Sequence, residues 1–247
     1  ADGLAGDYIH SIAEDGQGRL RFGAGAEDGG RGQGVSRYDG GELITFTKAD
    51  GLPHDWVYAI AVDGQDRVWF GGPGGATRYD GHEFLTFGSA DGLGGHRWDD
   101  NQSGGTTSYA GEAGHSVRAI KVDSRGAVWF ATRGGATRYD GTGFTLLTEA
   151  DGLSGDKAFT LAEDGEGSMW FGTDFGLDRY DGETFQHFGT KDGLCNNRVR
   201  TILADRDGAL WFGTFGGGLC RYEGNIQRIF TQQDGLPDNG LMTLLEA

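Results

Sequence analysis

The sequence has 247 residues, and its 37 acidic against 21 basic side chains give a net charge of −16. Such a surplus of negative charge repels phosphate backbones and anionic lipid surfaces, which argues against nucleic acid or a membrane surface as a partner. Forty-nine glycines, three prolines and 12% aromatic residues favour many short strands joined by tight turns over helices.

An internal repeat of about 42 residues organises the chain. The tripeptide Asp-Gly-Leu begins at residues 2, 50, 91, 151, 192 and 234, with steps of 48, 41, 60, 41 and 42 residues. Three of the steps agree within one residue, and the other two carry insertions. Each interval holds the same four phrases in the same order, which predicts one supersecondary unit per repeat.

The four phrases predict four strands, taken in chain order. The first is an apolar stretch that ends in Asp, at 9–15, 57–63, 117–123, 158–164 and 199–205. The second is of the V-W-F-G type, at 20–23, 68–71, 128–131, 169–172 and 210–213. The third is R-Y-D-G, or R-Y-E-G in the last repeat, beginning at 37, 78, 138, 179 and 221. A short F-x-x-F strand then runs into the next Asp-Gly-Leu, and turn residues separate all four.

Four-stranded antiparallel sheets that stack face to face predict an all-β fold, a β-propeller of five full repeats plus one extra inner strand. Successive residues of the second phrase are all large and apolar, so both faces of that strand must be covered. We predict a single domain over 1–247, with blades at about 8–49, 56–90, 116–150, 157–191 and 198–233, a partial sixth repeat at 240–247 and an insertion at 94–116. A right-handed β-helix or open solenoid is the competing fold, and closure with five blades stays open.

These phrases resemble the two-component regulator propeller repeat over nearly the whole chain. The fifth repeat shows the pattern most fully, in Asp205, Gly208, Leu210, Trp211, Phe212, Gly213, Thr214 and Gly217. The resemblance implies a sensory or ligand-binding module, periplasmic or extracellular, that precedes a membrane segment and a histidine kinase or other output domain. The repeats are more distantly similar to those of the virginiamycin B lyases, which are propeller enzymes.

Function is sought where the chain departs from its own repeat, because the shared residues only have to build a blade. The longest step, 60 residues against 41, contains an insertion suited to a binding lid at one mouth of the central channel. Its candidate ligand-binding residues are His96, Arg97, Trp98, Tyr109 and His115. A disordered insertion without a role is the alternative.

The second residue of each inner strand also varies in chemistry, while the residues after it stay small and then aliphatic. These further candidates for ligand binding are His10, Tyr58, Arg118, Phe159 and Arg200. Inner strands line the channel of a propeller, so these side chains are expected to converge near its axis. Arg118 and Arg200 could hold a small anion or a carboxylate there. Alternatively, each arginine packs its stem between blades and pairs with an acid.

The leading interpretation is therefore a non-catalytic sensory domain that binds a small ligand or a protein at the mouth of the channel. An enzyme of the lyase type, with His96, His115 and Glu112 as first candidates, is one alternative. A plain protein-interaction scaffold is another. No catalytic residue, metal site or cofactor is predicted.

The remaining predictions concern partners and covalent links. No run of 18 apolar residues and no leader-like opening occurs, so a soluble chain without a membrane span is expected. The unpaired strand 241–245 offers an edge for self-association. Cys195 and Cys220 are too few for a disulfide framework, and two small apolar fillers are preferred over a bond between them.

Overall fold

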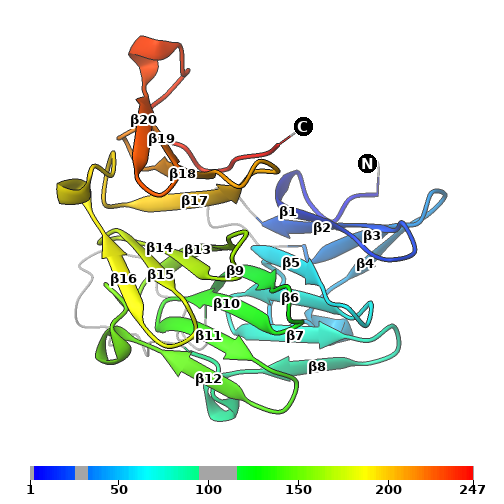
Figure 1. Ribbon diagram of the computed structural model, residues 1–247. Helices are drawn as coiled ribbons and strands as arrows, with labels where there is room; N and C mark the ends of the chain where they lie inside the picture. Colours follow the sequence, from blue (N-terminus) through cyan, green and yellow to red (C-terminus); the bar gives the residue numbers. More distant parts are fainter. Residues whose placement is uncertain (1–2, 26–32, 95–115, 247) are drawn as a thin grey trace, which may run out of the picture. The chain divides into compact units, whose positions relative to one another are not determined.

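The computed structural model describes residues 3–25, 33–94 and 116–246. Within these residues the chain forms five antiparallel sheets of four strands each, and the strands of every sheet lie in sequence order (Figure 1). This confirms the all-β class and the five four-stranded blades. We number the sheets blade 1 to blade 5 along the chain.

The strands have the following bounds. Blade 1 contains β1 (Tyr8–Glu14), β2 (Leu20–Gly25), β3 (Val35–Tyr38) and β4 (Leu43–Phe46). Blade 2 contains β5 (Ala59–Val62), β6 (Val68–Gly72), β7 (Gly75–Tyr79) and β8 (Phe84–Phe87). Blade 3 contains β9 (Val117–Val122), β10 (Val128–Thr132), β11 (Gly135–Tyr139) and β12 (Phe144–Leu147).

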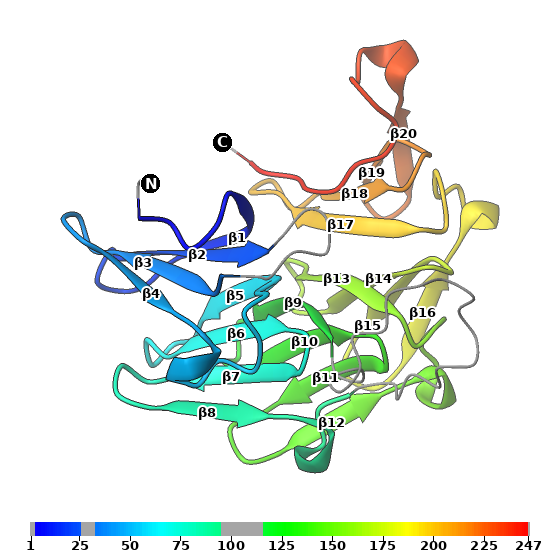
Figure 2. The same cartoon turned by 180° about the vertical axis from the view of Figure 1, so that it is seen from behind.

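Blades 4 and 5 repeat the pattern, as the reverse view in Figure 2 also shows. Blade 4 contains β13 (Ala158–Glu163), β14 (Met169–Thr173), β15 (Leu177–Tyr180) and β16 (Phe185–Phe188). Blade 5 contains β17 (Val199–Ala204), β18 (Leu210–Thr214), β19 (Leu219–Tyr222) and β20 (Ile226–Phe230). A three-residue 3₁₀ turn follows each blade: η1 (Lys48–Asp50), η2 (Ser89–Asp91), η3 (Glu149–Asp151), η4 (Thr190–Asp192) and η5 (Gln232–Asp234).

The hydrophobic cores lie between blades 1 and 2, between blades 2 and 3, and between blades 4 and 5. The chain divides into two compact units, 1–133 with 137–146 and 134–136 with 147–247. In the first unit the buried ring of Trp69 in blade 2 lies 5.5 Å from Phe130 of blade 3, centroid to centroid. In the second unit Trp170 of blade 4 lies 5.7 Å from Phe212 of blade 5. A single blade therefore leaves half of a core uncovered.

The Asp that ends each first strand closes the turn to the second strand. In blade 2, Asp63 Oδ1 accepts two backbone N–H groups of the turn at 3.0 Å, and Oδ2 accepts the indole N–H of Trp69 at 2.9 Å. The same indole bond measures 2.8 Å in blades 3, 4 and 5. In blade 1 Arg21 stands in place of Trp, and its buried guanidinium donates to Asp15. The first repeat thus keeps the bond and changes the donor.

The recurrent Asp-Gly-Leu marker builds the linker between blades. After blade 1, the carboxylate of Asp50 accepts the backbone N–H of Thr47 at 2.8 Å and caps the 3₁₀ turn. Gly51 has a φ of 121°, which strains any residue with a side chain, and a Cβ there would lie 2.7 Å from Phe84 of blade 2. Leu52 is buried between the two blades.

Residues 240–246 begin like a further inner strand but form no ladder. The N–H of Leu241 donates to the carbonyl of Thr214 at 3.0 Å, as Val57 does to Ala24 at 3.0 Å where blade 2 begins. Gly240 makes one isolated antiparallel bridge. Beyond it, 241–246 has no strand assignment, so the extra inner strand predicted at 241–245 is wrong as a β-strand. The physical reason is that no neighbouring strand among the described residues supplies the hydrogen bonds of a ladder.

Candidate functional site

Three of the predicted binding residues contact one another in the first unit. His10 lies in β1, Tyr58 directly precedes β5 and Arg118 lies in β9, at corresponding places of three successive inner strands. The His10 ring meets the Tyr58 ring edge-on, with centroids 5.5 Å apart. The guanidinium carbon of Arg118 lies 4.7 Å from the centroid of the same phenol ring. We call these three residues the first inner-strand cluster.

The first inner-strand cluster combines a cation, an aromatic face and a neutral imidazole. Burial lowers the pKa of His10 below 6.5, and the positive charge of Arg118 lowers it further. The imidazole is therefore uncharged at neutral pH, where it can donate or accept a hydrogen bond. A guanidinium stacked on a ring keeps its planar set of donors for a carboxylate.

The second unit carries a similar arrangement, which we call the second inner-strand cluster: Phe159, Asp174, Arg198, Arg200 and Phe215. The guanidinium of Arg200 in β17 lies 3.9 Å from the ring centroid of Phe159 in β13, and that of Arg198 lies 4.4 Å from Phe215. Asp174 pairs with both arginines, at 3.2 Å from Arg198 and 3.6 Å from Arg200. Two cations thus share one carboxylate.

Burial and two charged neighbours act on the pKa of Arg200. Burial lowers the pKa of Arg200, the carboxylate of Asp174 raises it, and the charge of Arg198 lowers it again. A guanidinium remains protonated at neutral pH despite such shifts. The pairing with Asp174 agrees with the interpretation of the arginines as partners of neighbouring acids, and a ligand carboxylate would compete for the same donors.

The candidate binding residues chosen from the sequence did not include Asp174, Arg198 or Phe215. Phe215 follows β18, at a turn where blades 2 and 3 have residues 73–74 (Pro-Gly) and 133–134 (Arg-Gly). Phe175, in the corresponding turn of blade 4, is 58% exposed and Phe215 is 50% exposed. Exposed phenylalanine in a glycine-rich turn departs from the repeat, and that departure was the available signal.

The other predicted site residues have no described position. His96, Arg97, Trp98, Tyr109 and His115 lie outside the described residues, and so does Glu112. In residues 3–25, 33–94 and 116–246, no group of three or more His, Cys, Asp or Glu side chains is arranged to hold a metal ion. The described helical segments are all too short to cross a membrane.

A second position repeats across the blades and joins each linker to the third strand. In blades 1, 3 and 4 the residue after Asp-Gly-Leu donates its backbone N–H to a side chain of that strand, whereas before blade 2 this residue is Pro53, which has no N–H to donate. Ala5 donates to Ser36 Oγ at 2.6 Å in blade 1, and Gly94 donates to Thr137 Oγ1 at 2.9 Å in blade 3. In blade 5 the two positions are Cys195 and Cys220, and they form a disulfide. The preference for two unbonded cysteines is thereby overturned.

Blade 4 places a buried carboxylate at this linker position. Asp178 accepts the hydroxyl of Ser154 at 2.6 Å and the backbone N–H of the same residue at 3.2 Å. Its other oxygen lies 3.2 Å from Nδ1 of His187. Burial raises the pKa of Asp178, and the hydrogen bonds from Ser154 and His187 offset part of that rise. This network differs from a Ser-His-Asp triad, because the carboxylate rather than the imidazole contacts the hydroxyl.

Comparison with solved structures shows the fold. The extracellular domain of a hybrid two-component system, BT3049 of B. thetaiotaomicron, matches with a TM-score of 0.73 and 21% identity, covering 96% of this chain and 30% of that one. A second such domain, BT4673 of B. thetaiotaomicron, matches with a TM-score of 0.53 and 17% identity, covering 90% and 37%. An inactive virginiamycin B lyase of Staphylococcus aureus with quinupristin gives 0.64 and 18% identity, covering 91% and 70%. The chain thus spans about a third of the two sensor-system domains.

Comparison by sequence gives the repeat family. No curated protein matches the chain significantly. The family model described as two-component regulator propeller matches residues 51–74, 152–175 and 193–216. Each match covers a linker with the first two strands of blade 2, 4 or 5. The chain is therefore an all-β protein that resembles the two-component regulator propeller repeat in these three segments.

Proposed function

We propose that this chain is a non-catalytic sensory domain that binds a small carboxylate-bearing ligand at the inner-strand clusters. The observation that carries the proposal is the stacking of arginine on an aromatic ring at the same place in successive inner strands. Arg118 lies over Tyr58 in the first unit, and Arg200 lies over Phe159 in the second. The likeness to extracellular domains of two-component systems supports a sensory role.

The net charge of the chain also supports anion binding at the arginines. In a chain of net charge −16, Arg198 and Arg200 lie close together and share the carboxylate of Asp174. Guanidinium groups that stack on rings lose less conformational freedom when they bind a carboxylate in two-pronged geometry. The flat aromatic faces of Tyr58 and Phe159 add contact area for a ring or an apolar stem.

A location outside the cytoplasm belongs to the same proposal. The Cys195–Cys220 disulfide supports it, because disulfides persist in oxidising compartments and are rare in the cytosol. The similar domains of B. thetaiotaomicron are extracellular by description.

The proposal is tested by thermal-shift screening with small mono- and dicarboxylates, aromatic carboxylates and uronic acids, followed by calorimetry on each hit. Arg118→Gln and Arg200→Gln keep the length of the side chain and remove its charge. Arg118→Gln is expected to weaken binding at the first inner-strand cluster and Arg200→Gln at the second, each by at least about tenfold, since a charge-assisted pair contributes on the order of 1.5–3 kcal/mol. Arg125→Gln, in an exposed turn, is the matched control and is expected to bind like the parent. Unchanged binding in both Arg118→Gln and Arg200→Gln would refute the site.

A further inference from the structure

Among the described residues, the face of blade 5 that points away from blade 4 lacks the aromatic partners that cover the same face of blade 4. Trp170 of blade 4 is buried, with its ring 5.7 Å from Phe212 and 5.2 Å from Tyr222 of blade 5. Trp211 occupies the same place in blade 5 and is only half-buried. Among the described residues, its one aromatic neighbour is Phe230 of its own blade, at 5.8 Å.

Residues 241–246 lie along this face, held at both ends. At the start, Leu241 packs on Gly213 so closely that a Cβ on the glycine would lie 3.0 Å from the Cβ of Leu241. Val199 packs on Gly172 in the same way where blade 5 follows blade 4, with a Cβ-to-Cγ1 distance of 2.8 Å. At the other end, Glu246 pairs with Arg206 at 3.6 Å. The segment therefore takes the place of an inner strand.

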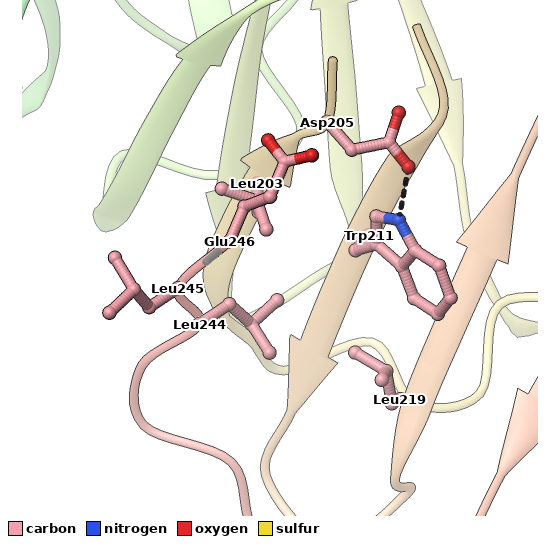
Figure 3. Close-up of a pocket in the computed structure, with 7 residues that line it drawn as sticks. All are labelled: Leu203, Asp205, Trp211, Leu219, Leu244, Leu245 and Glu246. Atoms are coloured by element: carbon pink, nitrogen blue, oxygen red, sulfur yellow. Dashed lines mark hydrogen bonds between the residues drawn. The ribbon is translucent and has the colours of Figure 1, made fainter. Parts of the chain in front are cut away.

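A pocket of about 340 Å³ opens between this segment and blade 5 (Figure 3). Its apolar lining comes from Leu203, Trp211 and Leu219 of blade 5 and from Leu244 and Leu245 of the segment. On the covered face of blade 4, the volume beside the tryptophan is filled by Phe212, which lies opposite Ile202 in the register of β17 and β18. Leu244 is the residue that corresponds to Ile202.

The outer edge of the segment is open. Within the part of the chain that the structure describes, residues 242–245 form no backbone hydrogen bond. Met242 is 71% exposed and Leu245 is 91% exposed. No charged residue occurs from 239 to 245, and no proline, so the features that normally protect a free edge are missing. Such an edge can accept one more strand by main-chain hydrogen bonding.

We propose that this edge and pocket bind an antiparallel β-strand of the aliphatic-Trp-Phe-Gly type from another protein chain that carries the same kind of repeat. The register follows from β17 and β18, where Ile202 lies opposite Phe212 and Leu203 lies opposite Trp211. The incoming Phe then lies opposite Leu244 and enters the pocket beside Trp211, and the incoming Trp lies opposite Leu245. This surface is separate from the two inner-strand clusters, so the proposal stands independently of the ligand.

A synthetic peptide with the sequence of residues 208–216, which contains Leu-Trp-Phe-Gly, is the probe. Its labelled form is titrated with the full chain by fluorescence anisotropy, and saturable binding is expected. A peptide with Asp in place of the central Phe is expected to bind at least about tenfold more weakly, because a charge would enter an apolar pocket. Hydrogen exchange of the chain is expected to show new protection at 242–246 when the peptide is bound.

Protein variants complete the test. Leu244→Asp is expected to weaken binding by at least about tenfold, whereas Leu85→Asp, on the exposed side of β8, is the matched control and is expected to have no effect. Equal binding of the Phe and Asp peptides overturns the proposal without relying on the folding of any variant. The proposal is also overturned if the chain self-associates, Leu244→Asp abolishes the self-association and the peptide does not compete with it. That result would show that the edge pairs with the same edge of a second copy and not with a strand of the aliphatic-Trp-Phe-Gly type.

Discussion

Replacement of Gly71 by alanine is expected to loosen the packing of blade 2 on blade 3. A Cβ on Gly71 would lie 2.5 Å from Cγ1 and 2.9 Å from Cβ of Val117, which is fully buried. Overpacking of this kind costs about 1–3 kcal/mol. The lower entropy of the unfolded chain returns about 0.4–1 kcal/mol. The net loss is up to about 2.6 kcal/mol and is centred near about 1.3 kcal/mol, which corresponds to a fall in Tm of about 3–5 °C for a chain of this size.

Thermal and urea unfolding of the purified chain measure this effect. Gly64→Ala is the matched control, because a Cβ there has no atom within 4 Å, and its Tm is expected to stay the same or rise slightly. Adding Val117→Ala to Gly71→Ala is expected to cost less than the two single changes together, because the clash disappears. At the corresponding positions of the third and fourth repeats, 131 and 158, the sequence has alanine. A Gly71→Ala variant as stable as Gly64→Ala would refute the close packing.

Three more outcomes follow from the site. Arg118→Ala is expected to raise the pKa of His10 towards 6.5, because a repelling charge is removed, and an NMR titration of the imidazole that shows no rise would contradict this. Burial raises the pKa of Asp178 above 3.8. The free energy of unfolding is therefore expected to fall as the pH rises from 3.8 through the raised pKa. Urea unfolding of the Asp178→Asn variant is expected to lack this fall. The double change Cys195→Ser with Cys220→Ser opens a loop of 25 residues and should cost about 3 kcal/mol in urea unfolding, while reductant should destabilise only the parent.

The strands could be predicted because local sequence decides them. The phrase at 68–71 reappears as β6, since large apolar residues on both faces of a strand are stable only inside a stack of sheets. The four Asp-Gly-Leu markers that join successive blades likewise become linkers with one structure, because Asp caps a turn, Gly adopts a positive φ and Leu is buried. These sequence patterns could be recognised because they recur from repeat to repeat.

The linker contacts could not be predicted in the same way. Asp178 and Ser154 are 24 residues apart, and their counterparts in blade 5 are two cysteines. The residue types at this pair of positions differ between blades 4 and 5, so no periodic sequence pattern marks the contact. Only the three-dimensional register of linker and third strand brings such pairs together. The disulfide was missed for this reason.

The candidate site was predictable in part. Counting along the inner strands placed His10, Tyr58 and Arg118 at equivalent positions, and they are neighbours in the first unit. Asp174 and Phe215 come instead from turns whose lengths differ between blades 4 and 5. A residue in a turn of variable length has no fixed place in the repeat count, so sequence alignment of the repeats gave no partner for Arg200.

Because the cores lie between blades, each hydrophobic core is built from two neighbouring repeats and not from a single one. One repeat supplies the covering face of one core and the covered face of the next, so duplication of a whole repeat adds one complete core. Gain or loss of repeats by recombination can therefore change the length of such an array without redesigning any residue. A cut in an Asp-Gly-Leu linker, by contrast, leaves two half-cores, each still shaped for the same kind of neighbour.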